Sequence, residues 1–374
     1  IDEAHNVAPS GRGNYAQDSM RTEAIRKIAP HFEHKLFLSA TPHNGYSESF
    51  TALLELLDDQ RFHRGAPPDK AQLGAVMVRR LKSELPPNDL GEPRFPKREL
   101  EAIEVDYTED ERQVHHDLQR YTELRQNGAL DATEAFATEF VLKLLKKRLF
   151  SSPEAFRSTL EKHADSVRSG KVRKLALPRP NLSVLRREVE SAEEESADDA
   201  LFEERNLEAV SATSTVFRPL DSEESKLLDR MLTWAERAAG RADVKARRLI
   251  KWLDETLRPG GKWNQERVII FTEYRATQNW LQELLAAHRF TENGRLRLLF
   301  GGMRSEEREA AKAAFQASPD VSEVRILLAT DAASEGIDLQ NHCSRLVHYE
   351  IPWNPNRMEQ RNGRIDRHGQ VARR

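Results

Sequence analysis

The sequence predicts an α/β protein with a long helical region in its middle. Three observations support this fold class. Short apolar stretches alternate with helical patterns from about residue 242 onward, one such pair occurs near the N-terminus, and helical patterns dominate between them. Short apolar strands that alternate with helices are typical of a parallel sheet covered on both faces. We therefore expect domains at residues 1–60, 61–241 and 242–374, the second being helical with a charged linker.

The N-terminal region predicts one strand followed by one helix. In KLFLSATPHNG, residues 36–38 are apolar and lead into a polar turn, which favours a buried strand. The next stretch carries Phe50, Leu53, Leu54 and Leu57 at positions i, i+3, i+4 and i+7. This spacing predicts a helix that buries one face.

The middle region predicts long helices and a charged segment. Thr108 and Glu111 have the spacing of a capping box that begins one helix. Residues 168–187 are rich in Lys and Arg, and residues 188–204 are dominated by Glu and Asp. Charge runs of this kind favour a solvated face or loop, although the sequence does not say what they contact.

The C-terminal region predicts four strands, RVIIFTE, RLRLLFGG, VRILLATD and SRLVHYEI. Two helices are predicted among them, ATQNWLQELLAAH and SEEREAAKAAFQ. Functional loops in parallel sheets lie at the carboxyl ends of the strands. Polar residues occur at three of those ends, namely Thr272-Glu273, Gly301-Gly302 and Thr330-Asp331.

Composition limits the classes of function. The formal net charge of -3 gives no global basic surface, so a nucleic-acid site must be a local patch. The single cysteine, Cys343, excludes an internal disulfide and fits a reducing cytoplasm. No apolar run approaches a membrane span and no signal peptide opens the chain, so we expect a cytoplasmic protein.

The first five residues, IDEAH, look like the end of a strand in a nucleotide-hydrolysing site, although the four residues DEAH alone would usually be a polar turn. In such sites an Asp after an apolar strand holds Mg²⁺, usually through water. The Glu beside it orients or deprotonates the attacking water. Asp2 and Glu3 are the residues in question.

A phosphate-binding loop should accompany that acidic pair, but the pattern G-x-x-x-x-G-K-[ST] does not occur in this sequence. The chain also begins without Met. We therefore expect that it is a piece of a longer protein whose upstream part carries the loop, and that this piece alone does not hydrolyse ATP.

Five stretches in order carry a resemblance to a known family: DEAH (2–5), SATP (39–42), VIIFTEY (268–274), ATDAASEGIDLQ (329–340) and EQRNGRIDRHGQ (359–370). Together they resemble helicase superfamily two, whose members are motors with two RecA-like lobes that bind ATP in the cleft between them. The resemblance implies two RecA-like lobes, the first one truncated, with a helical insertion between them.

Further stretches resemble one branch of that superfamily. WNPNRMEQRNGRIDRHGQ and VMVRRLKSEL (76–85) are similar to Swi/Snf-type ATPases, which track along duplex DNA and generally do not separate its strands. LFLSATPHNG and the pair Gln360-Arg361 favour the bacterial RapA-like branch. SATPHNGYSESFTALLELLDDQRF and KKRLFSSPEAF resemble the DrmD family, the Swi/Snf-type component of DISARM anti-phage systems. The implied partners are double-stranded DNA and other defence-system proteins, in the bacterial nucleoid.

The resemblance implies ATP and Mg²⁺ as cofactors and assigns the catalytic roles. Asp2 would hold Mg²⁺ through water, and Glu3 would activate the attacking water. Arg364 and Arg367 would contact the γ-phosphate, where a planar guanidinium suits the developing charge. If these arginines come from the second lobe, hydrolysis requires the lobes to close.

The same resemblance assigns binding and coupling roles. Ser39 and Thr41 would couple the nucleotide state to the grip on DNA. The expected nucleotide-binding residues are Gln360, Gly336 and Asp338. The expected nucleic-acid contacts are Thr272, Gly301, Gly302, Thr330 and Arg361. We expect the loss of Arg361 to affect hydrolysis less than the loss of the other two arginines.

Three functions remain open at this point. The first is an ATP-driven translocase on duplex DNA in phage defence. The second is a strand-separating DNA or RNA helicase of the same superfamily, which the Trp353-Asn354-Pro355 stretch and the large insertion argue against. The third is an ATPase-inactive fragment that serves as a binding module through its helical insertion. The sequence upstream of Ile1, or a companion chain, would separate the third from the first.

Overall fold

The computed structural model describes residues 1–9, 20–39, 47–89, 91, 94–173, 185, 198–334, 337–367 and 370. The chain divides into two compact units, residues 1–95 with 352–360 and residues 96–351 with 361–374. None of the helices in this described part combines the length and the apolar character that a membrane crossing requires.

The first unit is mainly helical. Its elements up to residue 84 are η1 (Ala4–Val7), α1 (Met20–Ile28), η3 (Ala29–His31), α2 (Ser47–Leu57), α3 (Lys70–Val76) and η4 (Lys82–Glu84). The helix predicted from the apolar spacing is α2, and its Leu53 and Leu56 pack with Val7 in a small core. The prediction of this helix is confirmed.

The prediction of a buried strand at residues 36–38 is wrong. Leu36 and Leu38 have exposed fractions of 69% and 50%. No strand forms here, although Leu38 N–H donates to Ile1 O at 2.9 Å and Ala4 N–H donates to Leu38 O at 2.8 Å. These two hydrogen bonds hold the backbone to the N-terminal residues and leave both leucine side chains in contact with solvent.

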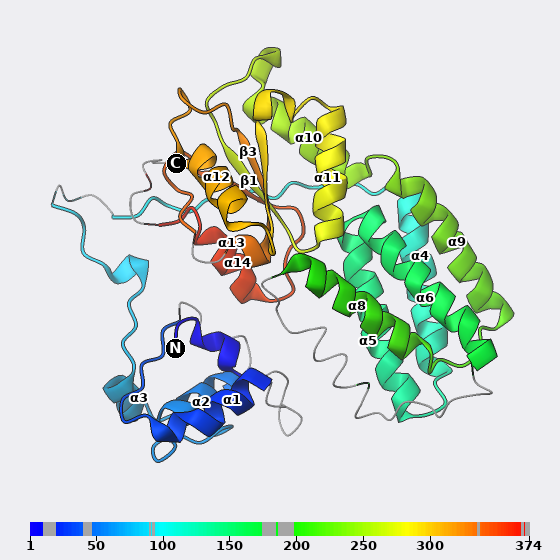
Figure 1. Ribbon diagram of the computed structural model, residues 1–374, viewed down its shortest axis with the longest axis horizontal. Helices are drawn as coiled ribbons and strands as arrows, with labels where there is room; N and C mark the ends of the chain where they lie inside the picture. The colour runs from blue at the N-terminus through cyan, green and yellow to red at the C-terminus, as the bar shows by residue number, and fades with distance from the viewer. Residues whose placement is uncertain are drawn as a thin grey trace. The chain divides into compact units, whose positions relative to one another are not determined.

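Among the described residues, the helical part of the second unit consists of long helices packed together (Figure 1), and their buried residues share one hydrophobic core. They are α4 (Glu109–Asn127), α5 (Ala132–Ser151), α6 (Pro153–Arg173), α8 (Asp199–Ser214) and α9 (Ser222–Ala239). The predicted capping box begins α4, because Thr108 N–H donates to a carboxylate oxygen of Glu111 at 2.8 Å. The long helices expected in this region are therefore confirmed.

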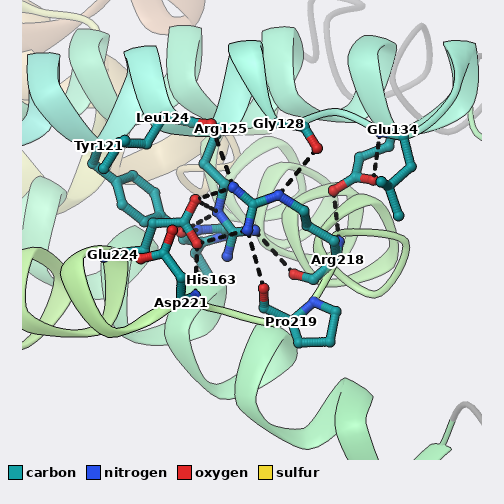
Figure 2. Close-up of polar contacts among 11 residues, drawn as sticks. Tyr121, Leu124, Arg125, Gly128, Glu134, His163, Arg218, Pro219, Asp221 and Glu224 are labelled. Atoms are coloured by element: carbon teal, nitrogen blue, oxygen red, sulfur yellow. Dashed lines mark hydrogen bonds and ion pairs between the residues drawn. The ribbon is translucent and has the colours of Figure 1, made fainter.

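A buried polar cluster ties α9 to α4 (Figure 2). Arg218 donates to both carboxylate oxygens of Glu224, at 2.9 and 2.5 Å, and to the carbonyl of Gly128 at 3.0 Å. A Cβ at position 128 would lie 2.6 Å from Arg218 Nε, so only glycine leaves room for this contact. Arg125 donates to the carbonyl of Arg218 at 2.9 Å and to Tyr121 Oη at 3.3 Å.

His163, at the edge of this cluster, makes a pH-dependent contribution to stability. Its ring nitrogens lie 2.8 Å from Tyr121 Oη and 2.7 Å from Ser214 Oγ. Burial, with a smaller contribution from Arg125, lowers the pKa of His163 from 6.5 to about 3. Below pH 6.5 the unfolded chain takes up a proton that the folded chain cannot accept, so this group's contribution falls as the pH falls.

We expect wild type to lose about 1.4 kcal/mol more stability between pH 7.5 and pH 5.5 than His163→Gln, because one pKa unit is worth about that energy. Urea unfolding of both proteins at the two pH values measures the difference. Equal losses in the two proteins would contradict a neutral buried His163.

The rest of the second unit is built on a four-stranded parallel sheet in the order β2-β3-β1-β4. The strands are β1 (Val268–Thr272), β2 (Leu296–Leu299), β3 (Ile326–Thr330) and β4 (Arg345–His348). The further helices of this unit are α10 (Val244–Leu257), α11 (Arg275–Ala287), α12 (Ser305–Gln316) and α13 (Asp331–Ser334). Helix α14 (Pro355–Asn362) begins in the first unit and ends in the second.

Helices cover both faces of this sheet. Helices α10 and α11 lie on one side and α12 on the other (Figure 1). Ile270 and Leu328 face the core formed with α10 and α11, whereas Phe271 and Leu327 face the core that contains Phe315 of α12. All four predicted strands and both predicted helices are confirmed, and so is the α/β class.

The helical part docks on the sheet part near the start of α11. Ser151 Oγ and Ser152 Oγ lie 2.6 and 2.8 Å from Thr277 Oγ1. Lys245 Nζ donates to the carbonyl of Ser151 at 2.7 Å, and the guanidinium of Arg148 lies 3.9 Å from the ring centre of Tyr274. These contacts explain why the two parts form one compact unit.

Candidate nucleotide and nucleic-acid site

The acidic pair of the first unit lies at the start of η1. Glu3 has φ 47° and ψ 50°, a left-handed conformation that is uncommon outside glycine. Its carboxylate lies 3.3 Å from His5 Nδ1 with an exposed fraction of 42%, and Asp2 Oδ1 accepts the Glu3 N–H at 3.0 Å. Strain of this kind occurs at functional sites, so the outlier supports a functional hypothesis for Glu3.

His5 links two of the motifs within the first unit. Its Nδ1 lies 3.0 Å from Ser39 Oγ, which joins the DEAH stretch to the SATP stretch. Its Nε2 lies 2.9 Å from Gln360 Nε2, a residue of the same unit. Sequence reasoning gave His5 no role of its own. Thr41 lies outside the described residues.

Asp2 suits a Mg²⁺ ion that ATP would bring. Its carboxylate is exposed, and oxygen is the ligand type that Mg²⁺ prefers. Within the described residues no group of three or more His, Cys, Asp or Glu side chains could hold a metal ion. A Mg²⁺ ion held by one carboxylate, water and substrate phosphates does not require such a group.

The polar residues of the second unit meet at the carboxyl edge of the sheet, as expected. Thr272 ends β1 and pairs in register with Thr330, which ends β3. Gly301 and Gly302 follow β2, the other neighbour of β3. Three strands thus bring these side chains and backbone groups to one edge.

Thr272 does not fit its expected contact with nucleic acid. It is fully buried, and its hydroxyl donates to Glu350 Oε1 at 2.8 Å. The same oxygen accepts the Glu273 N–H at 2.5 Å. Burial raises the pKa of Glu350, whereas Lys245 opposes this effect. Glu350 follows β4, and no local pattern in the sequence indicated that it would cap the end of β1.

Gly301 and Thr330 converge on a residue that sequence reasoning missed. The Gly301 N–H and the Thr330 hydroxyl both donate to Asp199 Oδ2, each at 2.6 Å. Asp199 is the first residue of α8 and only 6% exposed. It belongs to the acidic run at 188–204, for which we predicted a solvated face. That prediction is wrong for Asp199, because its carboxylate is buried against the sheet edge.

Arg361 is likewise buried. It is 1% exposed, and its guanidinium pairs with both carboxylate oxygens of Asp331, at 2.5 and 2.8 Å. A third hydrogen bond goes to the carbonyl of Glu350 at 3.0 Å. Arg361 is therefore tied to the carboxyl edge of the sheet. Its donors face protein oxygens, and the expected contact with nucleic acid stays a prediction.

The outer two arginines follow α14 in a turn. The helix ends at Asn362, and Arg364 N–H donates to Arg361 O at 3.0 Å. Arg364 is 6% exposed. Arg367 is 41% exposed and forms an ion pair with Asp338. Two residues assigned to the nucleotide thus contact each other, whereas Gly336 lies outside the described residues.

The sheet and its arginine turn fall within a known family model. Residues 246–369 match the model described as the helicase conserved C-terminal domain. The chain is also similar to the uncharacterized ATP-dependent helicase YqhH of Bacillus subtilis (strain 168), with 26% identity over 387 residues. This match covers 99% of the chain and 53% of the relative, so the chain spans about half of that helicase's length. These matches support a helicase of superfamily two.

Two solved structures resemble this chain with TM-scores below 0.5. The C-terminal part of the Fun30 ATPase domain gives a TM-score of 0.39 with 16% identity, covering 74% of this chain and 83% of that one. The Hef helicase domain of Pyrococcus furiosus gives a TM-score of 0.44 with 17% identity, covering 99% of this chain and 68% of that one.

Proposed function

We propose that this chain is part of an ATP-dependent translocase on double-stranded DNA, of Swi/Snf type, that acts in bacterial phage defence of the DISARM kind. The observation that carries the proposal is the convergence of Gly301 N–H and the Thr330 hydroxyl on one carboxylate oxygen. Backbone N–H groups and hydroxyls are the donors that hold nucleic-acid phosphates without reading sequence. Their position in a helicase-type domain supports a track along the DNA backbone.

The proposed mechanism divides the work among named residues. ATP would be the substrate and Mg²⁺ would offset the charge of its phosphates; Asp2 would hold the ion through water, and Glu3 would orient the attacking water. Arg367 leaves Asp338 and turns to the charge that develops on the γ-phosphate. DNA that bridges both lobes favours the closed state, so binding and hydrolysis are coupled.

The choice between translocation and strand separation is tested with two DNA substrates. Full-length protein with ATP is expected to displace the third strand of a triplex and to leave a forked duplex paired, because contacts with the backbone alone do not part the strands. The Glu3→Gln variant is the matched control, and it should neither displace the third strand nor separate the forked duplex. Efficient separation of the forked duplex would overturn the translocase proposal in favour of a helicase.

A further inference from the structure

We propose that Asp199 occupies the position of a DNA phosphate at the carboxyl edge of the sheet, so that α8 must withdraw from Gly301 and Thr330 before DNA binds there. The helical insertion would then inhibit the motor, because a carboxylate of the insertion takes the place of the DNA phosphate that the motor binds. This inference rests on the proposed function, since it assigns a regulator to the same site.

The geometry is that of an occupied anion site. One oxygen of Asp199 receives two donors at 2.6 Å, a backbone N–H and a hydroxyl. The backbone of Asp199 is also held, because its N–H lies 3.4 Å from Gly301 O. A phosphate oxygen accepts the same two kinds of donor, so carboxylate and phosphate compete for the same groups.

A positive charge beside the site favours an anion over a neutral group. Arg275, the first residue of α11, interacts electrostatically with Asp199. Its guanidinium lies 3.5 Å from the ring centre of Phe300, which comes just before the glycine pair. Burial raises the pKa of Asp199, while the hydrogen bonds from Thr330 and Gly301 and the charge of Arg275 oppose that rise.

A second carboxylate covers the neighbouring glycine. Gly302 has φ +80°, and a Cβ at that position would lie 2.7 Å from the carboxylate carbon of Asp198. Asp198 also caps α8, since its side chain accepts from Ala200 N–H at 2.9 Å and Leu201 N–H at 3.2 Å. The backbone of both glycines therefore faces the acidic start of α8.

A purely structural role for Asp199 makes a different prediction. If its only function were to fasten α8 to the sheet, a neutral amide oxygen could accept the same hydrogen bonds without the cost of a buried charge. Other contacts already hold α8, among them the ion pair between Glu203 and Arg148, with oxygen and nitrogen 2.6 Å apart. The charge at position 199 is explained by a site that selects anions.

The test is Asp199→Asn in the full-length protein, with Glu204→Gln as a matched control. Both variants remove one negative charge from α8, but Glu204 is exposed. The readout is fluorescence anisotropy with a labelled blunt duplex over a range of salt concentrations. We expect Asp199→Asn to bind roughly 5- to 150-fold more tightly, the range typical of coupled sites, and Glu204→Gln to change less than about twofold.

The salt dependence separates release of this site from a general gain in electrostatic attraction. The slope of log affinity against log salt should be the same in Asp199→Asn as in wild type, because the Gly301 N–H and the Thr330 hydroxyl are uncharged donors and release no additional counterions. Thr330→Val in the same background should remove the gain in affinity, because it deletes one of the two donors. Amide hydrogen exchange tests the same proposal in the wild-type protein. DNA should speed exchange in the first turn of α8, because that turn withdraws from the sheet when DNA binds.

The outcomes separate the two proposals. If Thr330→Val weakens DNA binding but Asp199→Asn leaves affinity unchanged, Asp199 is only a structural contact and the proposed function stands. The same conclusion follows if DNA leaves exchange in α8 unchanged. If neither wild type nor Asp199→Asn binds duplex DNA, the inference and the proposed function both fail.

Discussion

Arg367→Ala is expected to lower ATP turnover of the full-length protein by roughly 10³- to 10⁵-fold, the effect of losing an arginine that stabilises phosphoryl-transfer charge. Its effect on stability should be small, because the ion pair with Asp338 is exposed on both sides, at 41% and 58%. Arg364→Ala should reduce turnover similarly. Arg367→Lys should rescue poorly, since an ammonium does not reproduce the planar fork.

Steady-state ATP hydrolysis and duplex affinity, measured in parallel, check this prediction. Arg297→Ala serves as the control, because Arg297 is an exposed arginine on β2 of the same domain. A contact with DNA phosphate would chiefly change affinity and its salt slope. If both outer variants keep near-normal turnover while DNA affinity falls, the assignment of these arginines to the nucleotide is wrong.

Arg361→Ala is expected to lower the free energy of unfolding by about 3–5 kcal/mol, because it leaves the carboxylate of Asp331 without its buried partner. The guanidinium is 1% exposed and makes hydrogen bonds to Asp331 and Glu350. This effect is on stability, and the expectation that loss of Arg361 affects hydrolysis less than loss of the other two arginines stays a prediction. The double variant Arg361→Met with Asp331→Leu should recover much of the loss, since a buried ion pair can be replaced by apolar side chains.

Urea unfolding measures the change, with Arg345→Ala as the control. Arg345 pairs with Glu266 at 3.2 Å, but the two side chains are 48% and 47% exposed, so its loss should cost at most about 1 kcal/mol. An Arg361→Ala protein with unchanged unfolding and reduced DNA affinity would instead support the expectation of a nucleic-acid contact.

The sheet could be predicted from the sequence because its signals are local. Each strand is a short apolar run followed by polar residues, and parallel pairing brings the carboxyl ends to one edge. The capping box at Thr108 and Glu111 is local as well. The motifs therefore indicated which residues gather at that edge.

The partners of those residues could not be predicted, because they are distant in sequence. Asp199 lies 102 positions from Gly301 and 131 from Thr330. A charge run of this kind favours solvent on average, and nothing local marks Asp199 as a buried carboxylate. Arg361 shows the same limit, since the spacing of three arginines does not reveal which of them meets Asp331, 30 positions away.

The central claim, an ATP-driven motor that duplex DNA stimulates, is tested most directly by ATP turnover of the full-length protein with and without blunt duplex. The account predicts magnesium-dependent hydrolysis that the duplex stimulates and that Glu3→Gln abolishes. Turnover that is indifferent to duplex DNA, or that survives in Glu3→Gln, would contradict it.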